Sequence, residues 1–170
     1  MIAIGVDYGF RRVAIACAEM GWATSVYTPK LWDRGLELRV LATCLDDQEH
    51  ETHMFIEGAI GAGPLNIQTI VGMAATQGAL MLAHNGPSTI VAVSSWKKGV
   101  IGNGSADKEL VGIWLAEIWP NLYAACDTQD EIDAMCMSLY GKMLISGDIA
   151  PPAPKKKHKK KVKTNGPEAS

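Results

Sequence analysis

Two short apolar runs separated by a polar turn restrict the fold of this chain more than any other feature. Residues 2–6 form the first run and residues 13–18 the second, with Asp7-Tyr8-Gly9-Phe10-Arg11-Arg12 between them. Apolar runs of this length that are joined by a glycine-containing turn predict an antiparallel hairpin. A third stretch over residues 23–28 extends the hairpin to a three-stranded meander. We therefore expect a fold built on a β-sheet that includes the first residues.

Helices and strands alternate after this meander. Leucines at helical spacing predict a helix over residues 31–48, and an apolar run predicts a strand over residues 54–56 that leads into Glu57. A glycine-rich loop at residues 58–64 follows. The next helix is indicated by a stripe of Ile67, Ile70, Val71, Ala74 and Gly78.

The last third of the chain continues this alternation. Residues 89–93 are β-branched and apolar, which predicts a strand. A glycine-rich loop at 99–104 then leads into a helix over 106–119 that Pro120 stops. A final helix over 128–146 carries apolar residues at helical spacing, namely Ile132, Met135, Cys136, Leu139 and Met143. The pattern predicts an α/β fold with a mixed sheet that is covered by helices.

Composition excludes two classes of protein. The 170 residues fit one ordinary domain, and a content of 48% hydrophobic and 20% charged residues is that of a folded chain rather than a disordered one. No apolar run approaches the roughly 20 residues of a membrane span. Because residues 1–7 lack the pattern of a signal peptide, we expect a cytoplasmic protein. The cysteines have no short paired spacing, and we expect Cys17, Cys44, Cys126 and Cys136 to be reduced.

The sequence changes character after residue 150. A proline-rich stretch at 151–154 precedes a run of lysines that cannot form a core, so we predict a folded domain over 1–150 and a disordered tail over 151–170. The tail lysines are Lys155, Lys156, Lys157, Lys159, Lys160, Lys161 and Lys163. Without them, residues 1–150 hold nine basic and seventeen acidic residues, a net charge of −8. The tail is predicted to bind a polyanion such as DNA, although a nuclear-localisation signal has the same composition.

Four acidic residues stand where their carboxylates can converge. Asp7 and Glu57 each directly follow an apolar strand, and Asp130 and Asp133 lie three residues apart at the start of the final helix. Two carboxylates about 4 Å apart repel by roughly 4 kcal/mol at an effective dielectric constant near 20, so convergence requires bound cations. Oxygen ligands without nearby Cys or His favour Mg²⁺ or Mn²⁺, and two such ions suit displacement at a phosphodiester.

Simpler interpretations of the same acids stay open. Carboxylates at strand ends are commonly solvated. Asp130 and Asp133 also complement the positive end of the helix dipole, although residues 127 and 128 come first and are better placed as caps.

Four segments carry a resemblance to the RuvC-type Holliday junction resolvases. They are Gly5-Val6-Asp7-Tyr8-Gly9, Phe55-Ile56-Glu57, Val100-Ile101-Gly102-Asn103-Gly104-Ser105-Ala106-Asp107-Lys108 and Asp130-Glu131-Ile132-Asp133-Ala134, in this order and over roughly residues 1–146. The resemblance implies a ribonuclease H-like fold and a homodimer that makes two symmetric nicks across a four-way DNA junction. It also implies two Mg²⁺ ions per active site, for which Mn²⁺ substitutes, with no small-molecule cofactor and no membrane partner.

The resemblance assigns roles by position. The four acids match the family's catalytic metal ligands, and Lys108 matches a basic position near the DNA backbone, from which we expect it to neutralise the scissile phosphate. The pair Lys97 and Lys98 matches a basic position near the DNA backbone, and we expect the turn residues Arg11 and Arg12 to contact DNA as well.

Two departures from the family pattern bear on DNA recognition. Family members commonly carry an aromatic residue three positions after the strand-end glutamate, where this chain has Ile60. An aliphatic side chain can wedge open a base step but offers no aromatic face for stacking. The lysine-rich tail is not part of the usual bacterial pattern and indicates a phage-encoded or otherwise divergent member.

Three other functions fit the sequence less well. The hairpin also resembles the YqgF-type ribonucleases of ribosomal RNA maturation, which lack the extended stretch over residues 102–108. A non-catalytic DNA-binding protein of the same fold is disfavoured because an acidic cluster repels DNA unless metals fill it. A sugar-kinase-like nucleotide-binding domain needs a second domain that this length does not provide.

Small residues on the helix over 66–84, including Gly72 and Gly78, predict the dimer contact.

Overall fold

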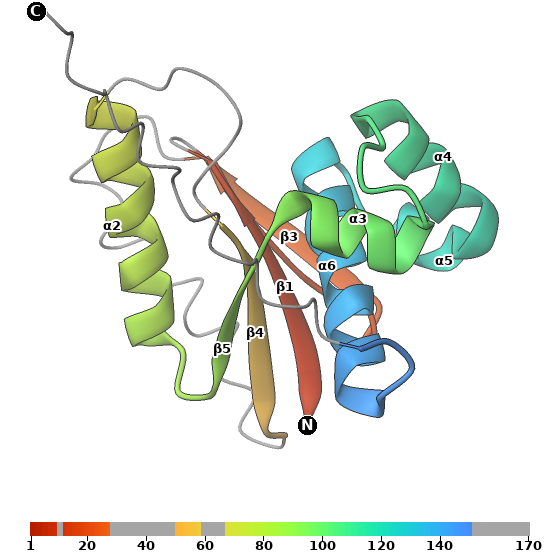
Figure 1. Ribbon diagram of the computed structural model, residues 1–170, viewed down its shortest axis with the longest axis horizontal. Helices are drawn as coiled ribbons and strands as arrows, with labels where there is room; N and C mark the ends of the chain where they lie inside the picture. The colour runs from red at the N-terminus through yellow and green to blue at the C-terminus, as the bar shows by residue number, and fades with distance from the viewer. Residues whose placement is uncertain (10–11, 28–49, 59–66, 151–170) are drawn as a thin grey trace, which may run out of the picture.

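The computed structural model describes residues 1–9, 12–27, 50–58 and 67–150 and contains a mixed five-stranded sheet (Figure 1). The strands lie in the order β3-β2-β1-β4-β5. Their bounds are β1 (Ile2–Tyr8), β2 (Arg12–Cys17), β3 (Trp22–Tyr27), β4 (Thr52–Glu57) and β5 (Ser88–Val91). The first three strands are antiparallel, whereas β4 runs parallel to β1 and β5 parallel to β4. The predicted meander and mixed sheet are confirmed.

The first hairpin is longer than its apolar residues indicate. Strand β1 continues through Asp7 and Tyr8, which pair with Ala14 and Val13 of β2. Asp7 therefore lies inside the strand rather than after it. Its backbone is held by the ladder on the β2 side.

Helices cover both faces of the sheet. Figure 1 shows α2 on one face and the helices α3 to α6 on the other. Their bounds are α2 (Ile67–Ala83), α3 (Val93–Ile101), α4 (Lys108–Ile118), α5 (Pro120–Ala124) and α6 (Gln129–Ser146). Alternate residues of β1 point to opposite faces, so Ile4 and Val6 pack in one core with Leu80 of α2. Ala3 belongs to the second core, which is formed with α3, α4 and α6.

Helix α6 crosses the central strand at unusually short range. A Cβ atom on Gly5 would lie 2.0 Å from the carbonyl oxygen of Ala134 and 2.4 Å from the amide nitrogen of Ser138. The buried Ser138 hydroxyl donates a hydrogen bond to the carbonyl of Ala3 at 2.7 Å and accepts one from the amide of Ala18 at 2.8 Å. These contacts fix the start of α6 relative to β1.

The sequence around residue 128 explains where α6 begins. The Thr128 side chain accepts a hydrogen bond from the amide of Glu131, and the Glu131 carboxylate accepts one from the amide of Thr128, which is a complete capping box. Residues 131–141 are buried on all sides of the helix. The predicted helix over 128–146 is confirmed.

Two sequence-based expectations about helices are wrong in detail. Residues 93–101 form α3, where a strand end and a glycine-rich loop were expected. Pro120 opens α5 instead of only ending α4, because proline lacks just the amide hydrogen that a first helical residue does not use. The apolar stripe of α2 does not face the core, since Ile67 and Val71 are 72% and 59% exposed. The sheet instead contacts a face that includes Leu80.

Several predictions fall outside the described residues. They concern the helix over 31–48, the residues Arg11, Cys44 and Ile60, and all the tail lysines, so the division at residue 150 stays a prediction. Cys126 and Cys136 are free thiols, and Cys17 is buried. In the described part of the chain, no helix has the length and apolar character needed to cross a membrane.

Candidate active site

Asp7 and Glu57 lie side by side on one face of the sheet. The parallel register pairs Gly5 with Phe55, and two residues further along both strands it brings Asp7 beside Glu57. Alternation places both on the face that packs against α6, because Gly5 contacts α6 directly and Phe55 belongs to the core beneath it. Figure 1 shows that the carboxyl ends of β1 and β4 share one end of the sheet with the start of α6.

Helix α6 brings two more acids to this end. Asp130 and Asp133 lie in its first turns, and the capping box at Thr128 fixes the direction in which the helix starts. Both affect the charge state of Asp7, as does Glu57. The four acids that the sequence singled out therefore lie at the same end of the sheet, near enough for their charges to act on Asp7.

Burial and neighbouring negative charges raise the pKa values of three of these acids, namely Asp7, Glu57 and Asp133. Desolvation is the main cause that raises the pKa of Asp7 from 3.8 to about 8, and the charges of Glu57, Asp133 and Asp130 add to it. Burial also raises the pKa of Glu57 and that of Asp133. At neutral pH, the metal-free site therefore holds the Asp7 side chain largely in its protonated form.

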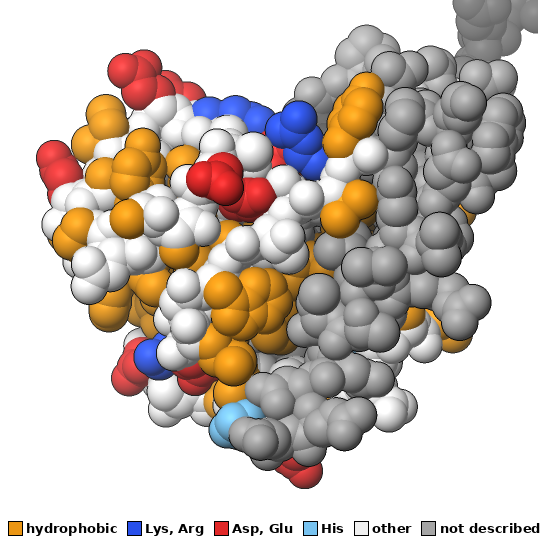
Figure 2. Space-filling view, turned by 180° about the vertical axis from the view of Figure 1, so that it is seen from behind, with side chains coloured by type: hydrophobic (Ala, Val, Ile, Leu, Met, Phe, Trp, Pro, Cys, Tyr) orange, Lys and Arg blue, Asp and Glu red, His pale blue; other side chains and the backbone are white. Residues whose placement is uncertain are grey.

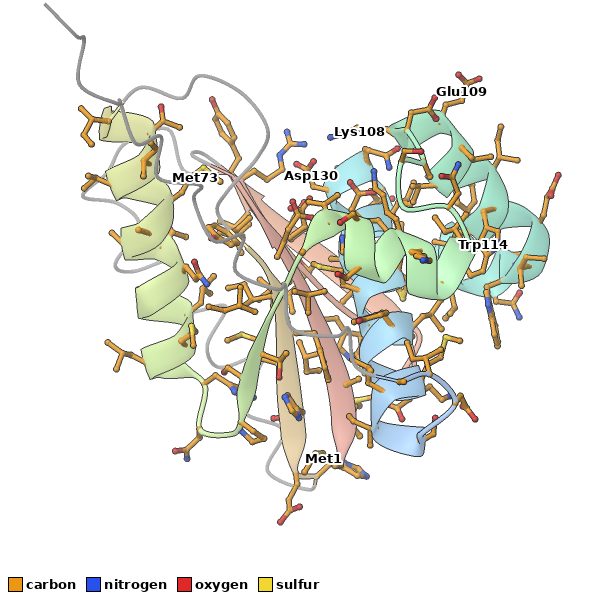
Figure 3. The ribbon with its side chains drawn as sticks, in the orientation of Figure 1. Met1, Met73, Lys108, Glu109, Trp114 and Asp130 are labelled. Atoms are coloured by element: carbon orange, nitrogen blue, oxygen red, sulfur yellow. The ribbon has the colours of Figure 1, made fainter. Side chains whose placement is uncertain are left out.

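Asp130 is the acid that the basic residues reach. Its Oδ2 atom lies 3.3 Å from Nη1 of Arg12 at the start of β2, and its Oδ1 atom lies 3.7 Å from Nζ of Lys108 at the start of α4. Figure 3 shows Lys108 and Asp130 at the same end of the sheet. Arg12 and Lys108 are both substantially exposed at the edge of the site. Figure 2 shows lysine and arginine side chains next to acidic ones along one edge of the molecule.

Glu57 and Asp133 are each held by a neutral donor. The indole nitrogen Nε1 of Trp96 donates to Oε2 of Glu57 at 3.4 Å, and the side-chain amide of Gln129 donates to Oδ1 of Asp133 at 3.0 Å. In the described part of the chain, the Asp7 carboxylate has no hydrogen bond and no ion pair. Among the described residues, the central acid thus has no direct partner, and only the charge of Lys108 lowers its pKa.

The two neighbouring lysines of α3 differ in their surroundings. Lys97 donates from Nζ to the carbonyl of Ala106 at 2.6 Å, and its charge lowers the pKa of Glu57 and that of Asp133. Lys98 is exposed and contributes to none of the acids' pKa shifts. Of the pair, Lys97 is the one beside the acidic cluster.

The donor chemistry of this cluster fits a hard divalent cation. All four candidate ligands are carboxylates, and Asp7 is partly buried with no hydrogen bond or ion pair in the described ranges. In this arrangement, no three Asp, Glu, His or Cys side chains among the described residues are close enough together to hold an ion. Asp130, Asp133 and Glu57 each contact a donor of their own.

Two neighbours of the acids were missed in the sequence. Gln129 stands four residues before Asp133 on the same helix, and that spacing was a usable signal. Trp96 lies on α3, a helix that the sequence did not indicate. Ile60, Arg11 and the tail lysines lie outside the described residues, so their predicted DNA contacts stay predictions.

Comparison with known proteins identifies the fold. No protein-family model matches the chain, and no curated protein matches its sequence. Two solved structures are similar over most of the chain. A structure of Thermus thermophilus RuvC has a TM-score of 0.66 and 18% identity and covers 87% of this chain and 97% of that one. The RuvC of the same organism in complex with a Holliday junction substrate has a TM-score of 0.68 and 16% identity and covers 86% and 96%, respectively. The chain has the ribonuclease H-like fold of RuvC.

Proposed function

We propose, from this fold as the premise, that the protein is a Mg²⁺-dependent endonuclease that resolves four-way DNA junctions by paired symmetric nicks. The observation that carries the proposal is the position of Asp7, Glu57, Asp130 and Asp133 at one end of the sheet, where Asp7 has neither a hydrogen bond nor an ion pair among the described residues. A similar structure, that of Thermus thermophilus RuvC, holds a Holliday junction substrate. Four-way and related branched DNA is therefore the proposed substrate class, and we propose that the enzyme acts in the cytoplasm of a bacterial or phage-infected cell.

The four acids would hold two Mg²⁺ ions, and Mn²⁺ offers a similar preference for oxygen ligands. Such ions activate a water for attack on phosphorus and stabilise the departing 3′ oxygen. Asp7 lies on the central strand, and the charges of the other three acids act on it, so it is best placed to contribute to both ions. Glu57 on β4 and Asp130 and Asp133 on α6 would complete the ligand set.

Basic residues at the edge of the site would hold the DNA. Arg12 and Lys108 flank Asp130, and Lys97 lies on the neighbouring helix, so a phosphate that approaches the acids meets three cations first. Lys108 is our candidate for neutralising the scissile phosphate. The tail lysines would add sequence-independent contacts to the DNA backbone.

A direct assay tests the proposed reaction. The protein is incubated with Mg²⁺ and labelled four-way junction, linear duplex or structured RNA of matched length, with Asp7→Asn as the inactive control. We expect symmetric, ligatable nicks in the junction and no cleavage of the other two substrates. Cleavage of the RNA in preference to the junction would instead favour the YqgF-type ribonuclease.

We also propose that α2 forms the homodimer contact. Its outward face carries exposed apolar residues, including Ile67, Val71 and Leu82. The small residues that suggested this contact divide between two faces, because Gly72 is buried within the domain whereas Ala74 is exposed. The apolar side chains, rather than the glycines, therefore give the contact its driving force.

A further inference from the structure

Trp96 is a fully buried aromatic residue whose single polar atom reaches the acidic cluster. Its side chain is 0% exposed and belongs to the core between the sheet and α3, α4 and α6. The indole Nε1 hydrogen is directed to Oε2 of Glu57 at 3.4 Å. In the described part of the chain, no other hydrogen bond to the Glu57 carboxylate is found. Trp96 thus belongs to the hydrophobic core and also donates a hydrogen bond to one of the four acids.

The strands position Trp96 for this contact. Glu57 pairs with Val91 in the neighbouring strand, and the amide of Gly58 donates to the carbonyl of Val91 at 2.8 Å. Helix α3 begins two residues later, so Trp96 lies in its first turns beside the end of β4. Lys97 lies with its Nζ 5.4 Å from the centroid of the Trp96 ring, which braces the indole from its face.

An indole is well suited to orient a carboxylate that must bind a cation. It has one donor and no acceptor, so it cannot itself compete for the cation as an amide or hydroxyl oxygen would. It is also uncharged and leaves the full negative charge of the carboxylate for the ion. A donor on Oε2 leaves Oε1 of Glu57 as the atom available to a metal.

We propose that Trp96 is a positioning residue that fixes the orientation of the Glu57 carboxylate and thereby sets the affinity of the acidic cluster for a divalent cation. The inference rests on the proposed metal-dependent function. Trp96 belongs to the core of the domain, and a residue without an indole hydrogen at position 96 would leave the Glu57 carboxylate without this hydrogen bond.

Binding of Mn²⁺ to the DNA-free protein tests the inference without any cleavage assay. The free Mn²⁺ signal is followed by electron paramagnetic resonance during titration of the wild type, Trp96→Phe and the control Trp114→Phe. Because loss of a residue that orients a ligand costs about 10- to 100-fold in metal affinity, we expect at least about a tenfold weaker Kd for Trp96→Phe. We expect Trp114→Phe, which changes a tryptophan of α4, to bind as the wild type does. A folded Trp96→Phe with unchanged Mn²⁺ affinity would overturn the inference.

A second measurement leaves Trp96 in place. In protein labelled with ¹⁵N at the indole nitrogens, Glu57→Gln should move the Trp96 indole proton upfield, because a charged acceptor is replaced by a weaker neutral one. The Trp22 signal should not move. An unmoved Trp96 signal would show that no such hydrogen bond exists in solution.

If the wild type binds Mn²⁺ and cuts junctions while both tests fail, only the role of Trp96 is lost. If the wild type binds no Mn²⁺, the metal-dependent function fails, and this inference falls with it.

Discussion

Asp7 is the residue on which the proposed chemistry most depends. The other three acids all raise its pKa, and among the described residues only the charge of Lys108 opposes this shift. Asp7→Asn keeps the size of the side chain and removes its negative charge. We expect cleavage of four-way junctions to fall below detection while junction binding persists or strengthens, because the DNA then meets less negative charge.

The same variant has a thermodynamic signature. Without metal, Asp7→Asn should be at least as stable as the wild type, and it should lose most of the stabilisation that Mg²⁺ gives the wild type, since that gain comes from binding to the native state. Thermal unfolding of both proteins in EDTA and in Mg²⁺ measures the difference. A variant that still cuts junctions at near the wild-type rate would contradict a metal site centred on Asp7.

The raised pKa of Asp7 also predicts how metal-free stability depends on pH. The folded protein keeps the Asp7 proton up to about pH 8, whereas the unfolded chain releases it near pH 3.8. Between these values the folded state binds more protons than the unfolded one, so stability should fall as the pH rises from about 4 to about 8. The loss should be on the order of a few kcal/mol.

Urea unfolding in EDTA across this pH range tests that expectation. Asp7→Asn should show a flatter profile, with a smaller fall left over because the pKa values of Glu57 and Asp133 are raised as well. Saturating Mg²⁺ should weaken the fall, since the ion binds the ionised carboxylates. A wild-type stability that rises from pH 4 to pH 8 in EDTA would rule out a protonated Asp7.

At the scale of secondary-structure elements, the contact between β1 and α6 holds the site together. Gly5→Ala would place a methyl group 2.0 Å from the carbonyl oxygen of Ala134, and backbone on both sides cannot yield easily. We expect a loss of about 3 kcal/mol in the free energy of unfolding, together with weaker Mg²⁺ binding because Asp133 moves away from Asp7.

Gly112 in α4 is the matched control for this substitution. A Cβ atom there meets nothing within 4 Å, so Gly112→Ala should raise stability by about 0.5 to 1 kcal/mol through helix propensity. Urea unfolding of both variants in EDTA measures the contrast. Equal stabilities of the two alanine variants would mean that α6 does not press on β1.

Elements were predictable where local signals agreed with tertiary packing. Helix α6 has a capping box at its start and a glycine at position 147 with a φ of 82° at its end, and both signals are visible in the sequence. Helix α3 has no capping side chain, because its N-cap is Ala92, and its apolar residues Val93, Trp96 and Val100 lie at helical spacing over only nine residues. So short an apolar pattern did not predict a helix, whereas in the structure Trp96 is buried in the core.

The positions of the acids at the ends of secondary-structure elements were predictable for the same reason. The basic partners of Asp130 were not. Asp7 and Glu57 follow apolar runs, and Asp133 opens a clearly marked helix, so position along the chain was informative. The ion pairs that Arg12 and Lys108 make with Asp130 join three elements that are distant in the sequence. Only the sheet order and the packing of α4 against α6 bring them together.

At the scale of the whole molecule, the exposed face of α2 predicts self-association. Val71→Glu places a charge on that face and should convert a dimer to a monomer at low micromolar concentration, as measured by sedimentation. Ile113→Glu is the control, because Ile113 is similarly exposed on α4. A dimer that survives Val71→Glu, or one that Ile113→Glu dissociates, would move the contact away from α2.

The basic tail predicts how the molecule as a whole binds DNA. Removal of residues 155–170 should weaken binding to all DNA shapes about equally, and each lost phosphate contact should reduce the log-log salt slope by about 0.9. The preference for junctions should remain, because it belongs to the folded domain. A truncated protein with unchanged affinity and salt slope would show that the tail does not touch DNA.

The crossing of α6 over β1 also sets the order in which this protein becomes functional during synthesis. The Ser138 hydroxyl donates a hydrogen bond to the carbonyl of Ala3, 135 positions earlier. The contacts of β1 with α6 therefore form only after α6 has been synthesised. Closing so long a loop makes the contact order high and the final folding step slow. A ribosome-bound chain that has not yet released α6 lacks Asp130 and Asp133 and exposes one face of its sheet. Such a nascent chain would be open to chaperones and would hold only two of the four acids, so the proposed nuclease activity would require that α6 has docked.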